Sequence, residues 1–136
     1  MIFDEIKGKD LKKYCVKSTD TIFNVIKQIN KNKNQFVVVL KKNKFIGIIT
    51  DGDIRRSILN KVSLNEKCLN IVNKSPTILR FNKLKEYNFD TIKNILTSKK
   101  IDQIPIIKNN EIYSLILNKR DINQKLAAFI FSGGRG

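Results

Sequence analysis

The sequence has no histidine and no tryptophan, and it contains only two cysteines and two prolines among its 136 residues. The lack of histidine excludes a Ser-His-Asp triad, a Cys-His dyad and an HExxH zinc helix. Cys15 and Cys68 are far apart and neither lies in a CxxC pair, so we expect no metal site. Spacing alone leaves a disulfide open, but two isolated cysteines in an intracellular chain are typical of buried, reduced thiols.

Long hydrophobic runs are also absent. The longest one, from Leu126 to Phe131, is far shorter than the roughly 20 residues that a membrane-spanning helix needs. The first ten residues contain Asp4, Glu5 and Asp10 and no apolar segment, so they do not resemble a signal peptide. Since 41% of the residues are apolar, the chain can still bury a core. The sequence therefore predicts a soluble, cytoplasmic protein of one domain or two very small ones, without a membrane partner.

Acidic residues are few, and 27 Lys and Arg against 12 Asp and Glu give a net charge of +15. Such an excess can indicate a protein that binds nucleic acid. However, only 5 of the basic residues are Arg, while 22 Lys, 22 Ile and 16 Asn suggest an AT-rich coding sequence. The lysines are also scattered along the chain. We therefore expect no nucleic-acid partner, and the alternative of a nucleic-acid-binding protein would show steeply salt-dependent binding.

An internal repeat organises the chain. The segment from Gln35 to Asp53 recurs 68 residues later, from Gln103 to Asp121, and each copy holds two β-branched runs around an Asn-containing turn. These copies predict β-hairpins at 35–50 and 103–118.

Helical patterns precede and follow the hairpins. Apolar residues at helical spacing predict one helix from Ile22 to Ile29, capped within 18–20, and another around Ile92 to Leu96 after Asp90 and Thr91. Further expectations are a short helix capped by Asp51, a connecting helix over 64–72 opened by Ser63 and Glu66, and a strand over 77–81. The predicted fold class is α/β (α+β), with two small repeats packed as a pseudo-twofold pair.

The segment 45–56, Phe-Ile-Gly-Ile-Ile-Thr-Asp-Gly-Asp-Ile-Arg-Arg, resembles the CBS domain, and its repetition resembles a tandem CBS pair, or Bateman module. The resemblance covers about residues 10–123. It implies an N-terminal segment and first repeat at 1–62 and a second repeat at 63–123.

The end of the sequence resembles the beginning of another domain. Residues 129–136 form an apolar run that enters a Gly-rich loop, and glycines allow backbone N–H groups to approach phosphate closely. Sugar-phosphate nucleotidyltransferases of the mannose-1-phosphate guanylyltransferase type begin similarly. We therefore expect 124–136 to be the truncated start of such a domain, in which case this fragment is not an enzyme but its parent is. The alternative is a flexible tail.

Thr50 and Asp53 are the main candidates for ligand binding. They stand three apart where a strand passes into a helix, so a hydroxyl and a carboxylate can face one cleft. The CBS resemblance implies that they bind the phosphate and ribose of AMP, ADP or ATP. We expect Gly52 to let the turn pass close to the ligand, and Arg55 or Arg56 on the following helix to reach a phosphate. A looser part of the same resemblance places the adenine between two strands, near Cys15, Val16 and Lys17 and near Phe36, Val37 and Val38. Alternatively, Asp51 and Asp53 only cap a helix and the arginines are solvated.

The second repeat departs from this pattern, because Asn118 replaces Thr and Leu115 replaces Gly. A weaker second site is expected from Ser75, Thr77, Asn118 and Asp121. The sequence thus favours a regulatory, homodimeric CBS pair that senses an adenosine nucleotide and modulates an attached nucleotidyltransferase. The alternative is a structural dimerisation module without a ligand.

Overall fold

The computed structural model describes residues 2–119 of the chain. Along the chain it contains the strands β1 (Ile2–Lys7), β2 (Cys15–Lys17), β3 (Phe36–Lys41), β4 (Lys44–Thr50), β5 (Leu79–Arg80), β6 (Gln103–Lys108) and β7 (Glu111–Lys119). Its α-helices are α1 (Ile22–Asn32), α2 (Asp51–Leu59) and α3 (Phe89–Lys99). Three short 3-10 helices, η1 (Gly8–Tyr14), η2 (Cys68–Asn70) and η3 (Phe81–Glu86), complete the described part. No helix within residues 2–119 has the length and apolar character needed to cross a membrane.

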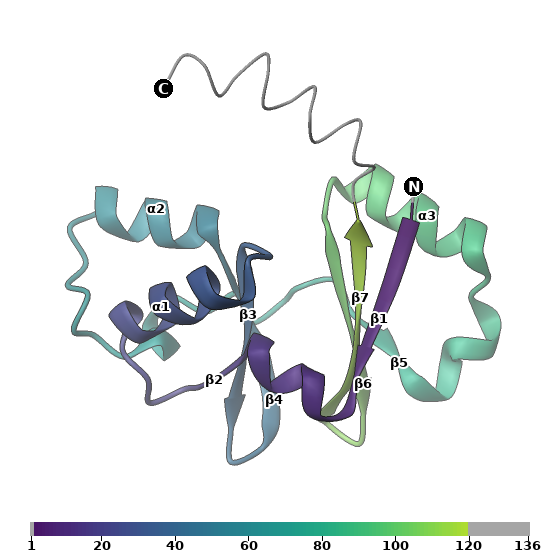
Figure 1. Cartoon of the computed structure of the whole chain (residues 1–136), viewed down its shortest axis with the longest axis horizontal. Coiled ribbons are helices and arrows are strands. Elements are labelled where there is room, and N and C mark those ends of the chain that lie inside the picture. The colour runs from purple at the N-terminus through teal and green to yellow at the C-terminus, as the bar shows by residue number, and fades with distance from the viewer. Residues whose placement is uncertain (1, 120–136) are drawn as a thin grey trace.

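The strands form two sheets that face each other (Figure 1). The first sheet has the order β2-β3-β4, and the second has the order β1-β7-β6-β5. Strand β1 belongs to the N-terminal segment, but it joins the second sheet. It pairs antiparallel with β7, with Ile2 opposite Lys119 and Lys7 opposite Ser114. The N-terminal segment therefore joins the two repeats.

Both predicted hairpins are confirmed. Strand β3 pairs antiparallel with β4, and β6 pairs antiparallel with β7. Each turn consists of two residues with positive φ, which are Lys42 and Asn43 in the first hairpin and Asn109 and Asn110 in the second. Two successive residues in the left-handed region fit the twist of a tight antiparallel hairpin, and Asn adopts this region more readily than most residues.

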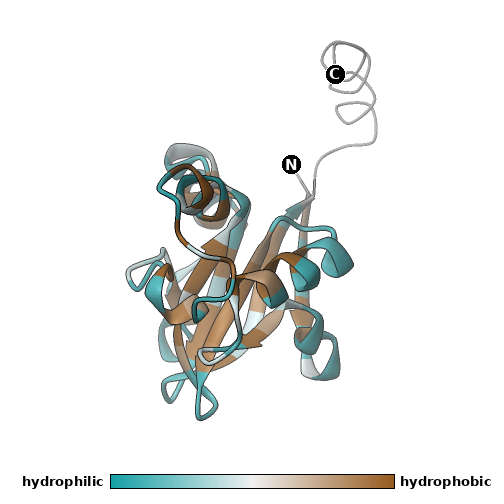
Figure 2. Ribbon diagram, turned by 90° about the vertical axis from the view of Figure 1, so that its left-hand side faces the viewer, coloured by the Kyte–Doolittle hydropathy of each residue, from teal (hydrophilic) through white to brown (hydrophobic). Residues whose placement is uncertain are grey.

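The described residues form four layers of helix, sheet, sheet and helix (Figure 1), with three apolar cores between them. Figure 2 shows that many residues of the strands in the middle of the molecule are hydrophobic. The first core lies between the first sheet and α1 and α2, and it includes the fully buried Ile22, Val25 and Ile49. The middle core joins the two sheets through residues such as Phe36 and Leu115. The third core packs α3 against the second sheet. The α/β pair of packed repeats that the sequence predicts is therefore confirmed.

The helix boundaries differ from the prediction by a few residues. Helix α1 is capped by Thr21, whose Oγ1 accepts a hydrogen bond from the Asn24 N–H at 3.1 Å, rather than by a residue of 18–20. Helix α3 begins at Phe89 and is capped by Asn88, so the region around Asp90 and Thr91 already lies inside it. In both cases a polar side chain one turn earlier or later satisfies the free N–H groups equally well.

The predicted connecting helix over 64–72 is wrong. Ser63 does accept a hydrogen bond at its Oγ, but from the backbone of Asn65, and the only helical turn is η2. The segment is held instead by contacts with other elements: Phe23 donates its backbone N–H to Leu64, and Asn73 forms a two-way bridge with Ile48 of β4. These tertiary hydrogen bonds replace those of a helix.

The predicted strand over 77–81 is shorter than expected. Only Leu79 and Arg80 pair with β6, in parallel register, and Phe81 already begins η3. Residues 120–136, with Arg120, Asp121 and the Gly-rich segment, lie outside the described residues. The domain boundaries at 62/63 and 123/124 stay predictions.

Candidate functional site

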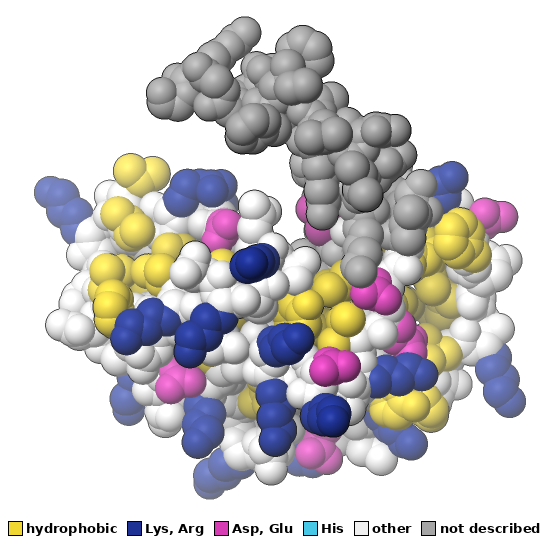
Figure 3. Space-filling view, viewed as in Figure 1, with side chains coloured by type: hydrophobic (Ala, Val, Ile, Leu, Met, Phe, Trp, Pro, Cys, Tyr) yellow, Lys and Arg dark blue, Asp and Glu magenta, His cyan; other side chains and the backbone are white. Residues whose placement is uncertain are grey.

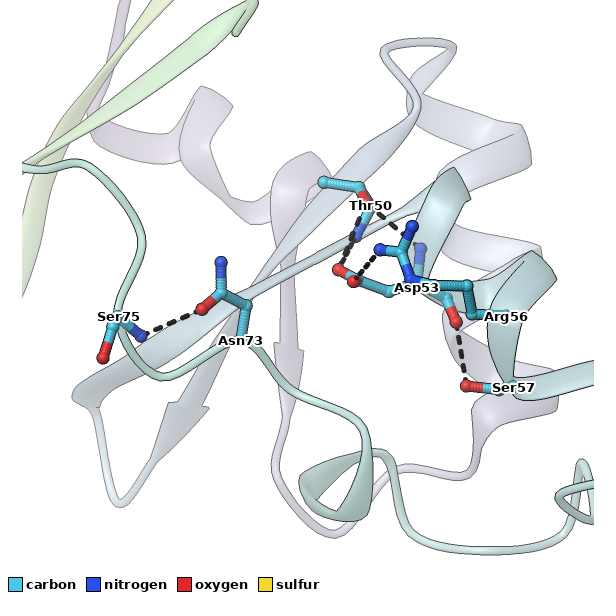
Figure 4. Close-up of polar contacts among 6 residues, drawn as sticks. All are labelled: Thr50, Asp53, Arg56, Ser57, Asn73 and Ser75. Carbon is cyan, nitrogen blue, oxygen red and sulfur yellow. Dashed lines mark hydrogen bonds and ion pairs between the residues drawn. The ribbon is translucent and has the colours of Figure 1, made fainter. Parts of the chain in front are cut away.

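Thr50 and Asp53 meet at the start of α2 in a reciprocal capping box (Figure 4). The Thr50 Oγ1 accepts a hydrogen bond from the Asp53 N–H at 3.3 Å, and Asp53 Oδ2 accepts one from the Thr50 N–H at 2.9 Å. A third contact joins the Thr50 hydroxyl to the same Oδ2 at 3.1 Å. The helix is therefore capped by Thr50, not by Asp51 as predicted. Two residues of the binding motif also fix the local backbone.

The second carboxylate oxygen of Asp53 faces Arg56 (Figure 4). Arg56 donates from Nη2 to Oδ1 at 2.6 Å, while the carboxylate side chain is only 19% exposed and the guanidinium is 68% exposed. Ser57 donates its hydroxyl to the Asp53 carbonyl at 2.8 Å, which adds a further bond within the helix. Since an exposed ion pair contributes little free energy, Arg56 can move aside for a ligand at small cost.

A cleft of about 390 Å³ opens beside this capping box and draws on both repeats. Thr50, Gly52 and Arg55 line it from the first repeat. From the second repeat it is lined by Lys100, Ile101, Asp102 and Gln103. The cleft thus lies where the two halves of the molecule meet, and a ligand in it would contact both.

Gln35 shapes the first-repeat wall of this cleft. Its φ of 66° lies in the left-handed region, which a glutamine adopts only at some cost. Its carbonyl accepts a hydrogen bond from the Asp51 N–H at 3.0 Å. The loop before β3 is therefore tied to the start of α2, and both are held in place for the cleft.

Sequence reasoning missed the loop residues Asn34, Gln35, Lys100 and Asp102 as candidates for this site. The signal was present, because the 68-residue offset relates Gln35 to Gln103 and Asn34 to Asp102. What the sequence did not show is that both loops face the same cleft.

Of the predicted adenine contacts, Val16 and Lys17 lie at the opposite end of the sheet from Thr50, whereas Phe36 pairs with Thr50 and Val37 with the adjacent Ile49. Val37 is fully buried in the first core. Lys17 pairs with Leu40 near the turn of the β3–β4 hairpin, whereas Thr50 pairs with Phe36 at the opposite end of the same sheet. Val16 and Lys17 line another cleft, described below. Their role toward a nucleotide stays a prediction, and the geometry gives it no support.

The residues of the predicted second site are also not brought together. Ser75 lines a separate cleft of about 340 Å³ with Arg80 and Asn110, near the turn of the β6–β7 hairpin. Asn118 lies at the other end of that hairpin and donates from Nδ2 to Asp102 Oδ1 at 3.3 Å. Thr77, which lies between Ser75 and Asn118 in the sequence, is half-buried. Asp121 lies outside the described residues.

The hairpin registers correct the predicted correspondence between Leu115 and Gly47. Gly47 and Ser114 each lie four residues after the two-residue turn of their hairpin, so Gly47 corresponds to Ser114 and Ile48 to Leu115. Ile48 and Leu115 are both buried in the middle core. A Cβ at Gly47 would overlap the Asn73 carbonyl, so the first repeat uses its glycine for a close backbone approach.

The two cysteines are free thiols. Burial raises the pKa of Cys15 from 9.0 to about 11. The pKa of Cys68 rises equally, through burial and the nearby carboxylate of Asp20. Cys68 is fully buried, and its Sγ lies 3.3 Å from the Lys17 carbonyl. Buried thiols with a high pKa are poor nucleophiles and metal ligands at neutral pH, so neither cysteine has the properties of a reactive site.

The fold and this cleft define a class of protein, namely paired α/β repeats with a Thr-x-x-Asp capping motif at the start of α2. Residues 9–60 match the family model of the CBS domain. The described chain also shares its fold with solved CBS structures. The CBS domain structure NE2398 superimposes with a TM-score of 0.65 at 18% identity, covering 93% of this chain and 99% of that one.

Two archaeal structures are also similar. The CBS domain protein PAE2072 from Pyrobaculum aerophilum, solved in complex with AMP, has a TM-score of 0.63 at 18% identity over 84% of this chain and 90% of that chain. Protein MJ1225 from Methanocaldococcus jannaschii has a TM-score of 0.62 at 26% identity over 76% of this chain and 42% of its own.

One curated protein matches by sequence. Uncharacterized protein RP505 of Rickettsia prowazekii (strain Madrid E) is 34% identical over 80 residues, or 59% of this chain. The aligned part spans 24% of that relative's length.

Proposed function

We propose that this chain is a non-catalytic regulatory module that binds an adenosine nucleotide in the cleft beside Thr50. The observation that carries the proposal is the position of Thr50 and Gly52 in one cleft with Lys100 and Asp102 of the other repeat. The CBS match over residues 9–60 and the AMP complex of the P. aerophilum protein support an adenosine ligand.

Each residue has a role in this proposal. The Asp53 carboxylate accepts hydrogen bonds from the ribose hydroxyls after Arg56 moves aside, and Thr50 donates its hydroxyl to a phosphate oxygen. Arg55 and Lys100 supply positive charge from opposite walls of the cleft. Once it has left Asp53, the Arg56 guanidinium adds a third positive charge near the phosphate. AMP, ADP and ATP differ in how many of these cations they engage.

Binding at this position can regulate an attached domain. The ligand contacts both repeats, so it favours the arrangement in which the two cleft walls are closest. A ligand shifts a conformational equilibrium only through its different affinities for the two states. The bridging contacts supply that difference.

The regulated domain in this proposal is a sugar-1-phosphate nucleotidyltransferase, of the mannose-1-phosphate guanylyltransferase type. The apolar run and Gly-rich segment of 129–136 support it. The length of the matching Rickettsia protein also fits a module joined to a larger protein.

We further propose that the module forms a cytoplasmic homodimer through α1 and α2. Figure 3 shows hydrophobic side chains gathered over these helices. Phe23 on α1 is 48% exposed, and Ile58 and Leu59 on α2 are 52% and 80% exposed. Exposed apolar side chains of this size on adjacent helices are typical of a protein–protein interface.

A ligand-free dimerisation module is the second candidate. The observation in its favour is that both oxygens of Asp53 already have partners within α2. In that case the motif serves only to cap the helix.

Calorimetry with AMP, ADP and ATP separates the two candidates when it is applied to the Asp53→Ala variant. Loss of hydrogen bonds to a charged group costs about 1.5–3 kcal/mol, so the dissociation constant should rise roughly 10- to 150-fold. The matched control is Asp90→Ala, which makes the same change in charge in the first turn of α3.

The control also excludes a non-specific effect. Both variants gain positive charge, so binding to a merely basic surface would tighten slightly in each. Unchanged or tighter binding by the Asp53→Ala variant, with native circular dichroism, would contradict the proposed site and leave the dimerisation module.

A further inference from the structure

A second, larger cleft of about 700 Å³ lies at the opposite end of the first sheet from Thr50. One wall is the loop that follows β2, and the other is the turn of the β3–β4 hairpin. Because Lys17 pairs with Leu40 at this end and Thr50 pairs with Phe36 at the other, the two clefts are separated by the length of the sheet.

The interior of this cleft is mainly apolar. Cys15, Val16 and Leu40 line it from two adjacent strands, and Val16 is buried. A raised pKa keeps the Cys15 thiol neutral at physiological pH, so it acts as an apolar surface here. A ligand can therefore bury an apolar body against these side chains.

The edges of the cleft are basic. Lys12, Lys17, Lys41 and Lys42 all line it and are exposed, while Asp20 is the only acidic residue among its lining residues. The Asp20 carboxylate already accepts a hydrogen bond from the Lys17 N–H at 2.7 Å. Figure 3 shows Lys and Arg side chains on the lower part of the face, near the end of the β3–β4 hairpin.

This basic rim is not simply a result of the lysine-rich composition. In the second repeat Asn109 corresponds to Lys42 of the turn, and Lys108 corresponds to Lys41. The Lys108 Nζ lies over the Phe81 ring, 4.4 Å from its centroid. Asn110 instead accepts a hydrogen bond from Phe45 of the first hairpin at 2.8 Å. Among the residues that the structure describes, only the first hairpin therefore has a lysine within its two-residue turn, and that turn borders an apolar cleft.

The walls are held in a fixed position before any ligand binds. The Ser18 N–H donates to the Leu40 carbonyl at 2.8 Å, which ties the loop to the hairpin. The Cys68 N–H donates to the Asp20 carbonyl at 2.8 Å, which ties the same loop to the segment between α2 and β5. Such preorganisation lowers the entropic cost of binding.

We infer that this cleft binds a small amphiphilic anion, with an apolar body against Cys15, Val16 and Leu40 and a phosphate or carboxylate head among the lysines. The shared chemistry is an apolar chain or ring that carries one end of negative charge. This site is distinct from the proposed nucleotide site.

Octyl phosphate is a suitable probe, with octyl glucoside as the uncharged analogue and inorganic phosphate as the head group alone, all used below their micelle concentrations. Calorimetry measures affinity, and amide chemical shifts locate the site. We expect octyl phosphate to bind more tightly than either control compound and to shift signals at 15–20 and 40–43.

The variant Lys17→Gln/Lys41→Gln removes two exposed charges from the rim and should weaken binding of octyl phosphate about 2- to 30-fold. The charge-matched control, Lys83→Gln/Lys85→Gln on η3, should leave it unchanged. Asp53→Ala should also leave it unchanged, which separates this inference from the nucleotide site. The inference would be overturned by equal binding of octyl glucoside or inorganic phosphate, by shifts elsewhere, or by equal weakening in the control variant.

Discussion

At the scale of single residues, Thr50 and Asp53 perform two tasks. They close the capping box of α2, and Thr50 also lines the cleft proposed for the nucleotide, which places its partner Asp53 next to that cleft. A substitution of either residue therefore affects the stability of α2 as well as the proposed site. Substituting either residue removes a cap that contributes about 0.5–2 kcal/mol, so the binding of each variant must be compared on folded protein.

Gly47 and Gly52 give a matched pair of substitutions. A Cβ at residue 47 would overlap the Asn73 carbonyl, so Gly47→Ala forces the linker away from β4 and should cost about 1–3 kcal/mol. A Cβ at residue 52 would lie 3.3 Å from the flexible end of Arg56, in the first turn of α2. Gly52→Ala should therefore be neutral or stabilise by up to about 1 kcal/mol. Urea unfolding measures both, and equal effects would contradict the close approach at Gly47.

The cysteines give a prediction about pH. Burial raises the pKa of both thiols to about 11, so between pH 9 and 11 the folded chain holds protons that the unfolded chain has released. The thiol contribution to stability is therefore complete below pH 9 and is lost as the pH rises toward 11. Iodoacetamide should react with the half-buried Cys15 of the folded protein at half its limiting rate near pH 11, and with the thiols of the urea-unfolded protein near pH 9. A midpoint near 9 for Cys15 of the folded protein would show that this thiol is solvated.

At the scale of elements, β1 is the part whose position is least evident from its own sequence. It carries Phe3, whose ring lies 4.6 Å from that of Phe89 on α3, and it forms the edge of the second sheet beside β7. The second sheet is therefore completed by residues that precede the first repeat. Its stability depends on a contact between the two ends of the described chain.

Phe3→Ala should destabilise the protein by about 1–3 kcal/mol, because the ring packs against the third core and against Phe89. Phe23→Ala is the matched control, because that residue is 48% exposed and the Lys27 ammonium lies over its ring. Because Phe23 also lies on the proposed dimer face, both variants are compared at a concentration at which the native chain is monomeric, and the expected effect of Phe23→Ala is then within about 0.5 kcal/mol. Hydrogen exchange should also accelerate in β7 of the Phe3→Ala variant but not in β3. Equal loss of stability in both variants would argue against the docking of β1.

At the scale of the whole molecule, the exposed residues of α1 and α2 predict self-association. Sedimentation velocity should show a dimer for the native chain. Leu59→Glu places a charge on the most exposed large apolar residue of this face, and we expect it to raise the dimer dissociation constant at least about tenfold. Asn82→Glu on the exposed part of η3 adds the same charge elsewhere and should leave the dimer intact. A monomeric native chain at high concentration would refute the proposed interface.

The sequence by itself determined the local features of this protein. The β-branched runs and paired Asn-containing turns specified two hairpins, because strand alternation and turn conformation are encoded within a few residues. The 68-residue repeat identified the pairing of two α/β units. The Thr50-x-x-Asp53 motif was found from the sequence because its two residues are only three positions apart and lie on one helix turn.

Only the tertiary structure decided which distant residues share a surface. It placed Val16 and Lys17 at the opposite end of the sheet from Thr50, because β2 and β3 run parallel and fix which ends meet. It brought Lys100 and Asp102 to the cleft beside Thr50 through the packing of the repeats. It also replaced the expected helix over 64–72 by turns and the short helix η2, since the bridge between Asn73 and Ile48 satisfies backbone groups through a contact with a distant strand. Short segments of sequence determine local hydrogen bonds and periodicity, whereas these contacts depend on the relative position of whole sheets.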